Sequence, residues 1–261
     1  MSLRALLLDV DGTLADTERH GHRPAYNRAF RKLGLSFRWG PRLYRKLLEQ
    51  PGGKERIEYF VSHYKPDLGA QADAYAADPR AWVESVHALK SRYFQRSLRK
   101  GQVPLRPGVA RLIREVDAAG LRVALVSNAS HASLKPMLRF GLGEELADRI
   151  DLVVSGEDVK RKKPAPDTYL LALSKLGIGA DECVALEDSS MGLRAAVAAG
   201  VPTIVTTNAN TEGEDFSQAV MVIDGCGEPD QPLRTARGTL TDPCLTLAHL
   251  QGFAHRARSA A

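Results

Sequence analysis

Short apolar runs that alternate with helical patterns place the strongest constraint on how this chain can fold. The runs with strand character are residues 4–8, 121–126, 151–154, 183–186, 201–206 and 219–223. Stretches with helical periodicity separate most of them, namely residues 109–119, 132–140, 166–176 and 189–199. Strands that alternate with helices are typical of a parallel sheet with helices on both faces. The sequence therefore predicts an α/β fold built on a doubly wound parallel sheet.

The chain between the first strand and about residue 99 has a different character. Its apolar residues recur at helical spacing, as at Tyr26, Phe30 and Leu33, and Gly52-Gly53 marks a turn within it. The segment beyond about residue 225 is rich in Gly, Pro and Thr, which predicts an irregular extension with one short helix near 245–253. The expected domains are an α/β core of residues 1–16 and 99–261, and a helical insert of residues 17–98.

Composition excludes several classes of protein. The 261 residues are 44% hydrophobic and 26% charged, as in ordinary soluble globular proteins, so disorder, collagen and coiled coil do not fit. No apolar run approaches the roughly 20 residues that a membrane span needs, and the first run leads directly into an acidic motif rather than a secretory cleavage site. The three cysteines form no C-x-x-C pair. We expect reduced cysteines and a cytoplasmic protein, or a plastid stromal one if a transit peptide has been removed.

Charge is distributed unevenly along the chain. The net charge is +5, yet residues 17–100 hold 18 Lys+Arg against 8 Asp+Glu, and the remainder holds 18 against 23. A basic segment beside an acidic one indicates a region that attracts anions next to a site that holds a cation. The basic residues are scattered among apolar ones and form no nucleic-acid motif. We therefore expect a small-molecule partner, with no nucleic acid and no membrane.

The first chemical motif is Asp9-Val10-Asp11-Gly12-Thr13, which follows the first predicted strand. Carboxylates two residues apart point the same way at a strand end. Their repulsion calls for a cation or a shared proton, and Mg²⁺, which prefers oxygen ligands, fits this need. The alternative is an ordinary turn, because Asp-Gly is a common turn dipeptide.

Three further motifs lie where a sheet of this kind binds its ligands, at the carboxyl ends of strands. Ser127-Asn128 offers a hydroxyl and an amide to a phosphate oxygen, although a helix cap would use the same residues. Lys163 offers a compact positive charge, and Pro164 restricts its backbone, although a solvated basic loop is the alternative. Glu187-Asp188 offers further metal ligands, although either Asp188 or the serine after it could cap a helix.

Together and in this order, the four motifs resemble those of the haloacid dehalogenase (HAD) superfamily of phosphatases and phosphomutases. The resemblance covers about residues 4–224. It implies a Rossmann-like core with a helical (C1-type) cap domain inserted after the first strand. The resemblance also implies that Asp9 is the nucleophile and that Asp11 is the general acid and base. Relatives that dehalogenate need no second aspartate, so Asp11 argues for phosphoryl transfer.

The same resemblance implies roles for the other motif residues. Asp9, Asp188 and the backbone carbonyl of Asp11 would bind Mg²⁺, and Glu187 would support that metal through its ligands. The residues that would stabilise the transferring phosphoryl group are Ser127, Asn128 and Lys163. Serine stands first in the second motif where some superfamily members have threonine, and its hydroxyl can do the same work.

The helical insert resembles a narrower group, the CbbY family. The resemblance is carried by Asp16-Thr17-Glu18, Gly21-His22-Arg23, Phe37, Trp39, Leu43-Tyr44, Leu47-Leu48 and Gly52-Gly53-Lys54-Glu55-Arg56. Proteins of this family are sugar-bisphosphate phosphatases linked to the Calvin cycle, and they remove the 1-phosphate of xylulose 1,5-bisphosphate, a by-product that inhibits Rubisco.

This narrower resemblance implies a substrate site in the insert. Lys54 and Arg56 would bind the distal phosphate, Glu18 and His22 would contact the sugar, and Gly53 belongs to the same site. Binding at a distant phosphate can raise the rate of the reaction at the other. The alternatives are a solvated helical face for Lys54 and Arg56, and a structural role for His22.

Two other functions compete with the phosphatase. A β-phosphoglucomutase-like hexose phosphomutase shares the core motifs and the type of cap. A phospho-ligand sensor without turnover would keep the fold, although the intact carboxylates and lysine argue against it. We expect a monomer, because the core and the cap together form one closing unit.

Overall fold

The computed structural model describes residues 2–50 and 52–259, with side chains up to residue 254. The described chain forms two compact units. One contains the residues up to Asp16 together with Leu105 onward, and the other is Thr17–Pro104. We call them the α/β unit and the helical unit.

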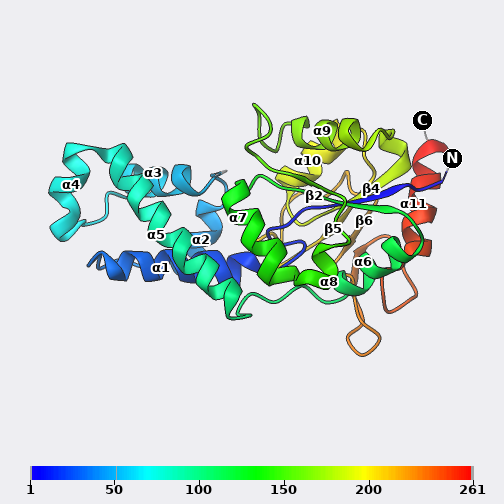
Figure 1. The fold of residues 1–261 in the computed structure, drawn as a ribbon, viewed down its shortest axis with the longest axis horizontal. Coiled ribbons are helices and arrows are strands. Elements are labelled where there is room, and N and C mark those ends of the chain that lie inside the picture. Colours follow the sequence, from blue (N-terminus) through cyan, green and yellow to red (C-terminus); the bar gives the residue numbers. More distant parts are fainter. Residues whose placement is uncertain (1, 51, 260–261) are drawn as a thin grey trace. The chain divides into compact units, whose positions relative to one another are not determined.

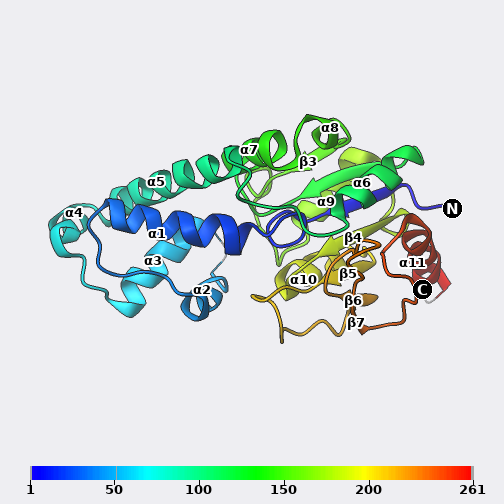
Figure 2. The same cartoon turned by 90° about the horizontal axis from the view of Figure 1, so that it is seen from below.

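The α/β unit contains a seven-stranded sheet in the order β3-β2-β1-β4-β5-β6-β7. Every strand pairs in parallel with its neighbours except β7, which is antiparallel to β6. Figure 2 shows β4 to β7 following one another in this order. The strands are β1 Ala5–Leu8, β2 Arg122–Val126, β3 Leu152–Val154, β4 Cys183–Glu187, β5 Thr203–Thr206, β6 Met221–Ile223 and β7 Thr235–Arg237. The predicted doubly wound α/β fold is confirmed.

Helices lie on both sides of this sheet (Figure 1). Ala5 and Leu7 of β1 belong to a buried cluster with residues of α9 and α10, and α6 packs on β2. Because side chains alternate along a strand, the same short apolar runs supply both faces of the core. The helical segments of this unit are α6 Val109–Ala118, α7 His131–Pro136, η3 Met137–Leu142, α8 Glu144–Ala147, α9 Asp167–Leu176, η4 Ala180–Glu182, α10 Ser190–Ala198 and α11 Leu247–Ser259.

Local signals set the ends of several helices. Beyond the end of α6, Gly120 has a φ of 69°, which glycine adopts without strain, as its stop signal predicts. The side chain of Ser189 accepts a hydrogen bond from the backbone N–H of Gly192 at 3.2 Å and caps α10. The loop before α10 is thereby fixed, and it is the loop that carries Asp188.

The helical unit has a core rich in aromatic rings. Trp39 lies at its centre, with ring centroids 4.5 Å from Tyr26, 4.9 Å from Phe30 and 5.3 Å from Phe60. Asn27 fixes the backbone of Trp39, accepting from its N–H at 2.7 Å and donating to its carbonyl at 3.0 Å. The segments of this unit are η1 Glu18–His22, α1 Arg23–Lys32, α2 Pro41–Leu47, α3 Gly53–Tyr64, η2 Gly69–Gln71, α4 Ala72–Ala77 and α5 Pro79–Arg99.

The segment beyond residue 225 is more regular than the sequence predicts. It contributes β7 to the sheet and forms α11, which starts at Leu247 and extends beyond the expected end. Arg111 of α6 holds the segment by donating to the carbonyls of Cys226, Gly227 and Leu245 at 3.0–3.1 Å. The three cysteines are free and buried. Within the described residues, no helix has the length and apolarity to cross a membrane.

Candidate active site

Three carboxylates meet where β1 and β4 end. Leu8 pairs with Leu186 in the register of the two strands, and the N–H of Asp9 donates to the carbonyl of Leu186 at 3.0 Å. Asp9 therefore lies beside Glu187 and Asp188, and all three are buried. Ligand atoms of the three side chains lie within 4.8 Å of one another. The parallel register brings together two motifs that are far apart in the sequence.

Lys163 joins this cluster as a buried cation. Its Nζ donates to Asp9 Oδ1 at 2.8 Å, to Glu187 Oε1 at 2.6 Å and to the carbonyl of Val126 at 2.7 Å. Asn128 holds the backbone of Lys163, accepting from its N–H at 2.8 Å and donating to its carbonyl at 3.1 Å. Through Lys163, all four predicted motifs are thus joined by direct hydrogen bonds.

Charge in the cluster is not balanced. Burial raises the pKa of Asp9 to about 7, against the opposing effect of Lys163. Burial, with the neighbouring Asp9 and Glu187, also raises the pKa of Asp188 well above its ordinary value. Asp9 and Glu187 raise the pKa of Lys163, outweighing the effect of burial, so the lysine stays charged. Three carboxylates and one lysine leave an excess of negative charge, and this all-oxygen donor set fits Mg²⁺.

The loop after Asp9 is shaped around Asp188. Gly12 has a φ of 97°, and a Cβ there would lie 2.1 Å from Asp188 Oδ2, so only glycine fits. Asn208 donates from Nδ2 to Asp188 Oδ2 at 2.7 Å. Asp11 is half-buried on this loop, and its charge adds to the rise in the pKa of Asp9. The structure thus brings Asp11 near Asp9 and fixes the orientation of Asp188.

Ser127 is buried directly after β2. Its N–H donates to the carbonyl of Val154, and its Oγ accepts from the N–H of Ala129 at 3.0 Å. Leu125 pairs with Leu8, so Ser127 lies at the same edge of the sheet as Asp9. The second motif is therefore placed where the sequence analysis expects it.

Three residues outside the predicted set support this site. Arg106 is buried and donates to the carbonyls of Gly12 at 2.5 Å, Thr206 at 2.8 Å and Asp224 at 2.7 Å, which ties the first loop to the ends of β5 and β6. Tyr169 donates to Glu187 Oε1 at 2.5 Å, and burial raises its pKa well above the ordinary value, so the phenol keeps its proton. Asn208 is the third. Each stands alone among ordinary loop or helix residues, so no motif marks it.

A second polar cluster lies within the helical unit. The hydroxyl of Tyr44 donates to Glu18 Oε2 at 2.5 Å and accepts from the guanidinium of Arg56 at 3.1 Å. Arg56 is buried and also donates to the carbonyl of Leu47 at 3.0 Å. The solvated-face alternative is therefore wrong for Arg56. Burial and the charge of Glu18 raise the pKa of Tyr44 well above its ordinary value, so its hydroxyl stays neutral and links the two charges.

The other residues predicted in the insert lie around this cluster or apart from it. Lys54 is half-exposed and pairs with Glu84 at 3.3 Å. The ring of His22 is buried and lies 4.1 Å from the ring of Phe94. The carbonyl of Gly53 accepts from the hydroxyl of Tyr26 at 3.0 Å, and a Cβ on Gly53 would lie 2.5 Å from the imidazole of His87. Glu18 and Arg56 thus meet through Tyr44, whereas Lys54 and His22 have other partners.

Comparisons with known proteins agree with this geometry. Residues 3–200 match the family model of haloacid dehalogenase-like hydrolases. The protein CbbY of Cupriavidus necator is 38% identical, over 97% of this chain and 92% of its own length. The crystal structure of CbbY from Rhodobacter sphaeroides in complex with phosphate is similar with a TM-score of 0.76 at 38% identity, covering 85% of this chain and 94% of that one.

A mutant of the Rhodobacter sphaeroides protein has been solved in complex with xylulose 1,5-bisphosphate. It is similar to this chain with a TM-score of 0.75 at 38% identity and the same coverage, 85% and 94%. The family match spans most of the chain, and the CbbY relatives match it at nearly full length. The chain therefore belongs to the haloacid dehalogenase-like hydrolases and, within them, to the CbbY family of phosphatases.

Proposed function

We propose that this chain hydrolyses a sugar bisphosphate with the help of Mg²⁺, and that xylulose 1,5-bisphosphate, converted to xylulose 5-phosphate, is its substrate. The observation that carries the proposal is the buried pair of Asp9 and Lys163, 2.8 Å apart, at the carboxyl end of the central strands. A carboxylate held in one orientation beside a fixed cation is suited to attack a phosphate. The sugar bisphosphate bound to the related Rhodobacter protein supports the choice of substrate.

The reaction begins with attack by Asp9. One oxygen of its carboxylate forms a bond to phosphorus while the bond from phosphorus to the sugar oxygen breaks, which gives an aspartyl-phosphate. Asp11 donates a proton to the departing sugar oxygen. Asp11 then accepts a proton from a water molecule, whose oxygen attacks the phosphorus. Inorganic phosphate leaves, and the carboxylate of Asp9 is restored.

Other residues of the α/β unit stabilise the charge that is transferred. Lys163 is fixed by Asn128 and Glu187, so its Nζ is in place before the substrate arrives. Ser127 and Asn128 offer further donors to the phosphoryl oxygens. Asp9, Asp188 and the carbonyl of Asp11 would hold Mg²⁺, with Glu187 supporting them, and the ion would lower the repulsion between the phosphate and its nucleophile.

The helical unit supplies the specificity in this proposal. Arg56 and Lys54 bind the second phosphate, and Glu18, with His22 and Gly53, contacts the sugar. The contacts that Arg56 makes with Leu47 and Tyr44 fix its guanidinium in one orientation, which favours recognition of a single anion position. We also infer a monomer, which size-exclusion chromatography with light scattering would test.

The experiment that tests the substrate measures phosphate release with Mg²⁺. The panel contains xylulose 1,5-bisphosphate, ribulose 1,5-bisphosphate, fructose 1,6-bisphosphate and β-glucose 1-phosphate. We expect strong selectivity for the first compound. Equal rates on all three bisphosphates would contradict the substrate assignment and leave a general phosphatase.

The competing functions give different results in the same assay. A hexose phosphomutase would form glucose 6-phosphate from β-glucose 1-phosphate, with little release of inorganic phosphate. A sensor would bind phosphorylated sugars without release. In the α/β unit, Asp9 pairs with Lys163 and lies close to Asp188, which favours turnover over sensing.

A further inference from the structure

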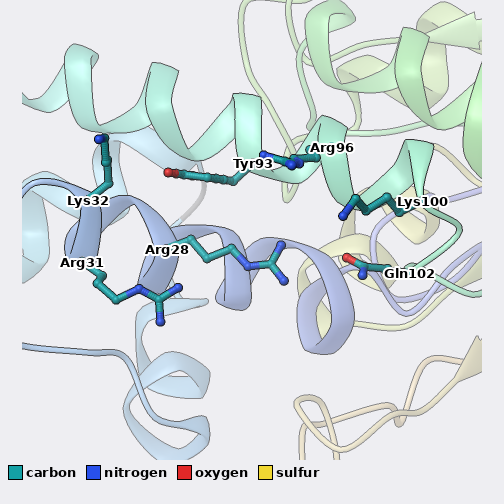
Figure 3. Close-up of a pocket in the computed structure, with 7 residues that line it drawn as sticks. All are labelled: Arg28, Arg31, Lys32, Tyr93, Arg96, Lys100 and Gln102. Atoms are coloured by element: carbon teal, nitrogen blue, oxygen red, sulfur yellow. The ribbon is translucent and has the colours of Figure 1, made fainter.

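A basic groove runs between two helices of the helical unit. Its volume is about 440 Å³, and its lining residues are Arg28, Arg31, Lys32, Tyr93, Arg96, Lys100 and Gln102. The first three come from α1, and the rest come from α5 and the residues that follow it. Figure 3 shows these side chains strung along the two helices, with Lys32 at one end and Lys100 and Gln102 at the other.

The groove contains five cationic side chains and no carboxylate. Within the described part of the chain, none of the five lies in ion-pair distance of an acidic side chain, and Arg28 donates instead to the buried hydroxyl of Ser97 at 3.1 Å. Like charges three and four residues apart on one helix face, as at Arg28, Arg31 and Lys32, destabilise that helix. An arrangement that costs free energy in the empty protein is favourable once an anion lies between the charges.

Helix ends explain only part of this charge. Arg31 and Lys32 lie in the last turn of α1, and Arg96 lies in the last turn of α5, where helix carbonyls attract cations. Arg28 is half-buried in the middle of α1, so the helix dipole does not account for it. Tyr93 is half-buried and lines the groove beside the cations with its aromatic ring.

The groove is separate from the cluster of Glu18, Tyr44 and Arg56. On α1, Tyr26 packs toward that cluster, because its ring lies beside Tyr44 and its hydroxyl bonds to Gly53. Arg28 follows two residues later, which places it about 200° around the helix. The groove therefore lies on the other side of α1 from the residues assigned to the substrate.

We propose that this groove is a second ligand site, which binds a small molecule that carries several phosphates. Its volume is that of a small-molecule pocket rather than a nucleic-acid track, and the five cations match the charge of a polyphosphate chain. The ring of Tyr93 offers a surface on which a nucleobase can stack. A nucleoside triphosphate combines these features, so it is the probe with which we test the site.

The test measures binding of the imido analogue of ATP, which resists hydrolysis, to the full chain by calorimetry at physiological ionic strength. The test variant is R96Q/K100Q, because both residues are exposed and their replacement leaves the core intact. The matched control is R38Q/R92Q, which removes the same charge from exposed positions outside the groove. We expect the test variant to lose affinity by about tenfold or more, with no loss in the control. Inorganic tripolyphosphate should displace the analogue.

Several results would overturn the proposal. One is the absence of binding at millimolar concentrations of the analogue, and another is an equal loss of affinity in the two double variants. A third is full affinity in R96Q/K100Q, which would place the ligand elsewhere, as at the active site. An RNA oligonucleotide that binds more tightly with length and resists displacement by tripolyphosphate would make the groove a nucleic-acid surface instead. R96Q/K100Q should hydrolyse the sugar bisphosphate at the wild-type rate without nucleotide, so failure here is distinguishable from failure of the proposed function. Thermal melting checks the fold of both variants.

Discussion

The active-site cluster and the basic groove are opposite cases of the same imbalance. At the active site, three buried carboxylates lie close together, and one lysine pairs with two of them, Asp9 and Glu187. In the groove, five cations share a cavity without a carboxylate. The first is missing positive charge and the second is missing negative charge. Where the fold brings like charges together at a cost in free energy, the charge of the ligand that belongs there has the opposite sign.

The cluster of Glu18, Tyr44 and Arg56 is an intermediate case. It contains one acid and one base joined through a neutral hydroxyl, so its charges are satisfied within the protein. Such a cluster orders the helical unit whether or not a ligand is bound. Its role in substrate binding therefore needs a test that separates recognition from folding.

The largest expected effect comes from replacing the nucleophile. Asp9→Asn keeps the shape and a hydrogen-bonding oxygen beside Lys163 but removes nucleophilic character. We expect turnover of xylulose 1,5-bisphosphate to fall by a factor on the order of 10⁴ or more, measured as phosphate release. Ser130→Ala, in the loop after Asn128, is the control. An unchanged rate in Asp9→Asn would refute the mechanism and leave the carboxylate cluster with a structural role only.

The next effect tests the cluster of Glu18, Tyr44 and Arg56. Arg56→Ala should lower kcat/KM for the bisphosphate by about 100-fold, because a buried cation that meets an anion contributes strongly. Hydrolysis of p-nitrophenyl phosphate, which has no second phosphate, should change little. Arg80→Ala, which removes an exposed arginine paired with Glu84, is the matched control. Equal losses on both substrates would show that Arg56 only holds the fold of the helical unit.

A smaller effect concerns the positioning of Asp188. Asn208→Ala removes the donor 2.7 Å from Asp188 Oδ2 and leaves the carboxylate free to rotate. We expect the Mg²⁺ concentration for half-maximal activity to rise about tenfold, as is common when a partner of a metal ligand is lost. Asn210→Ala, in the same loop, should leave it unchanged. A fall in kcat at unaltered Mg²⁺ dependence would contradict this role.

The last prediction concerns stability instead of activity, and it rests on the pKa of His87 in the helical unit. Burial, then the charge of Lys90, lowers the pKa of His87 to about 3 from its ordinary 6.5; Lys54, His22 and Arg56 act in the same direction. Between these values the unfolded chain binds a proton that the folded chain does not. The free energy of unfolding therefore falls as pH drops below about 6.5, by up to about 1.4 kcal/mol per pH unit.

Denaturant titrations at several pH values check this prediction. His87→Gln should reduce the pH dependence of the free energy of unfolding between about pH 6.5 and pH 4, where the histidine of the folded wild-type protein stays neutral. His63→Gln, at an exposed position of α3, should leave the slope as it is. A wild-type slope that His87→Gln does not alter would assign the acid sensitivity to other groups.

Sequence patterns predicted the strands well because most of them are continuous apolar runs bounded by turn residues. The edges moved by one or two residues, as at β5, which begins at Thr203 after Pro202. The order of strands could not be predicted, since it depends on long-range pairing. β7 was missed because Thr235–Arg237 is short, polar and mostly exposed.

The site shows the same division. Asp9, Lys163 and Asp188 could be found because each stands in a motif whose chemistry is recognisable. Arg106 could not, because an arginine before Pro107-Gly108 gives no sign that carbonyls from separate loops will converge on it. In the sequence, Tyr169 lies among the apolar residues of a predicted helix, and nothing there indicates that its hydroxyl will bond to Glu187. Residues that position others depend on contacts formed only in the folded chain.

β7 also bears on how the protein behaves at high concentration. Without β7, the apolar strand β6, Met221–Ile223, would form the edge of the sheet and leave backbone N–H and C=O groups unpaired. Such an edge invites pairing with another molecule and is a route to aggregation. With β7 present, the edge strand is only three residues long and ends in the exposed Arg237. The strand at the opposite edge, β3, is equally short. The segment after residue 225 thus acts as a shield against edge-to-edge association.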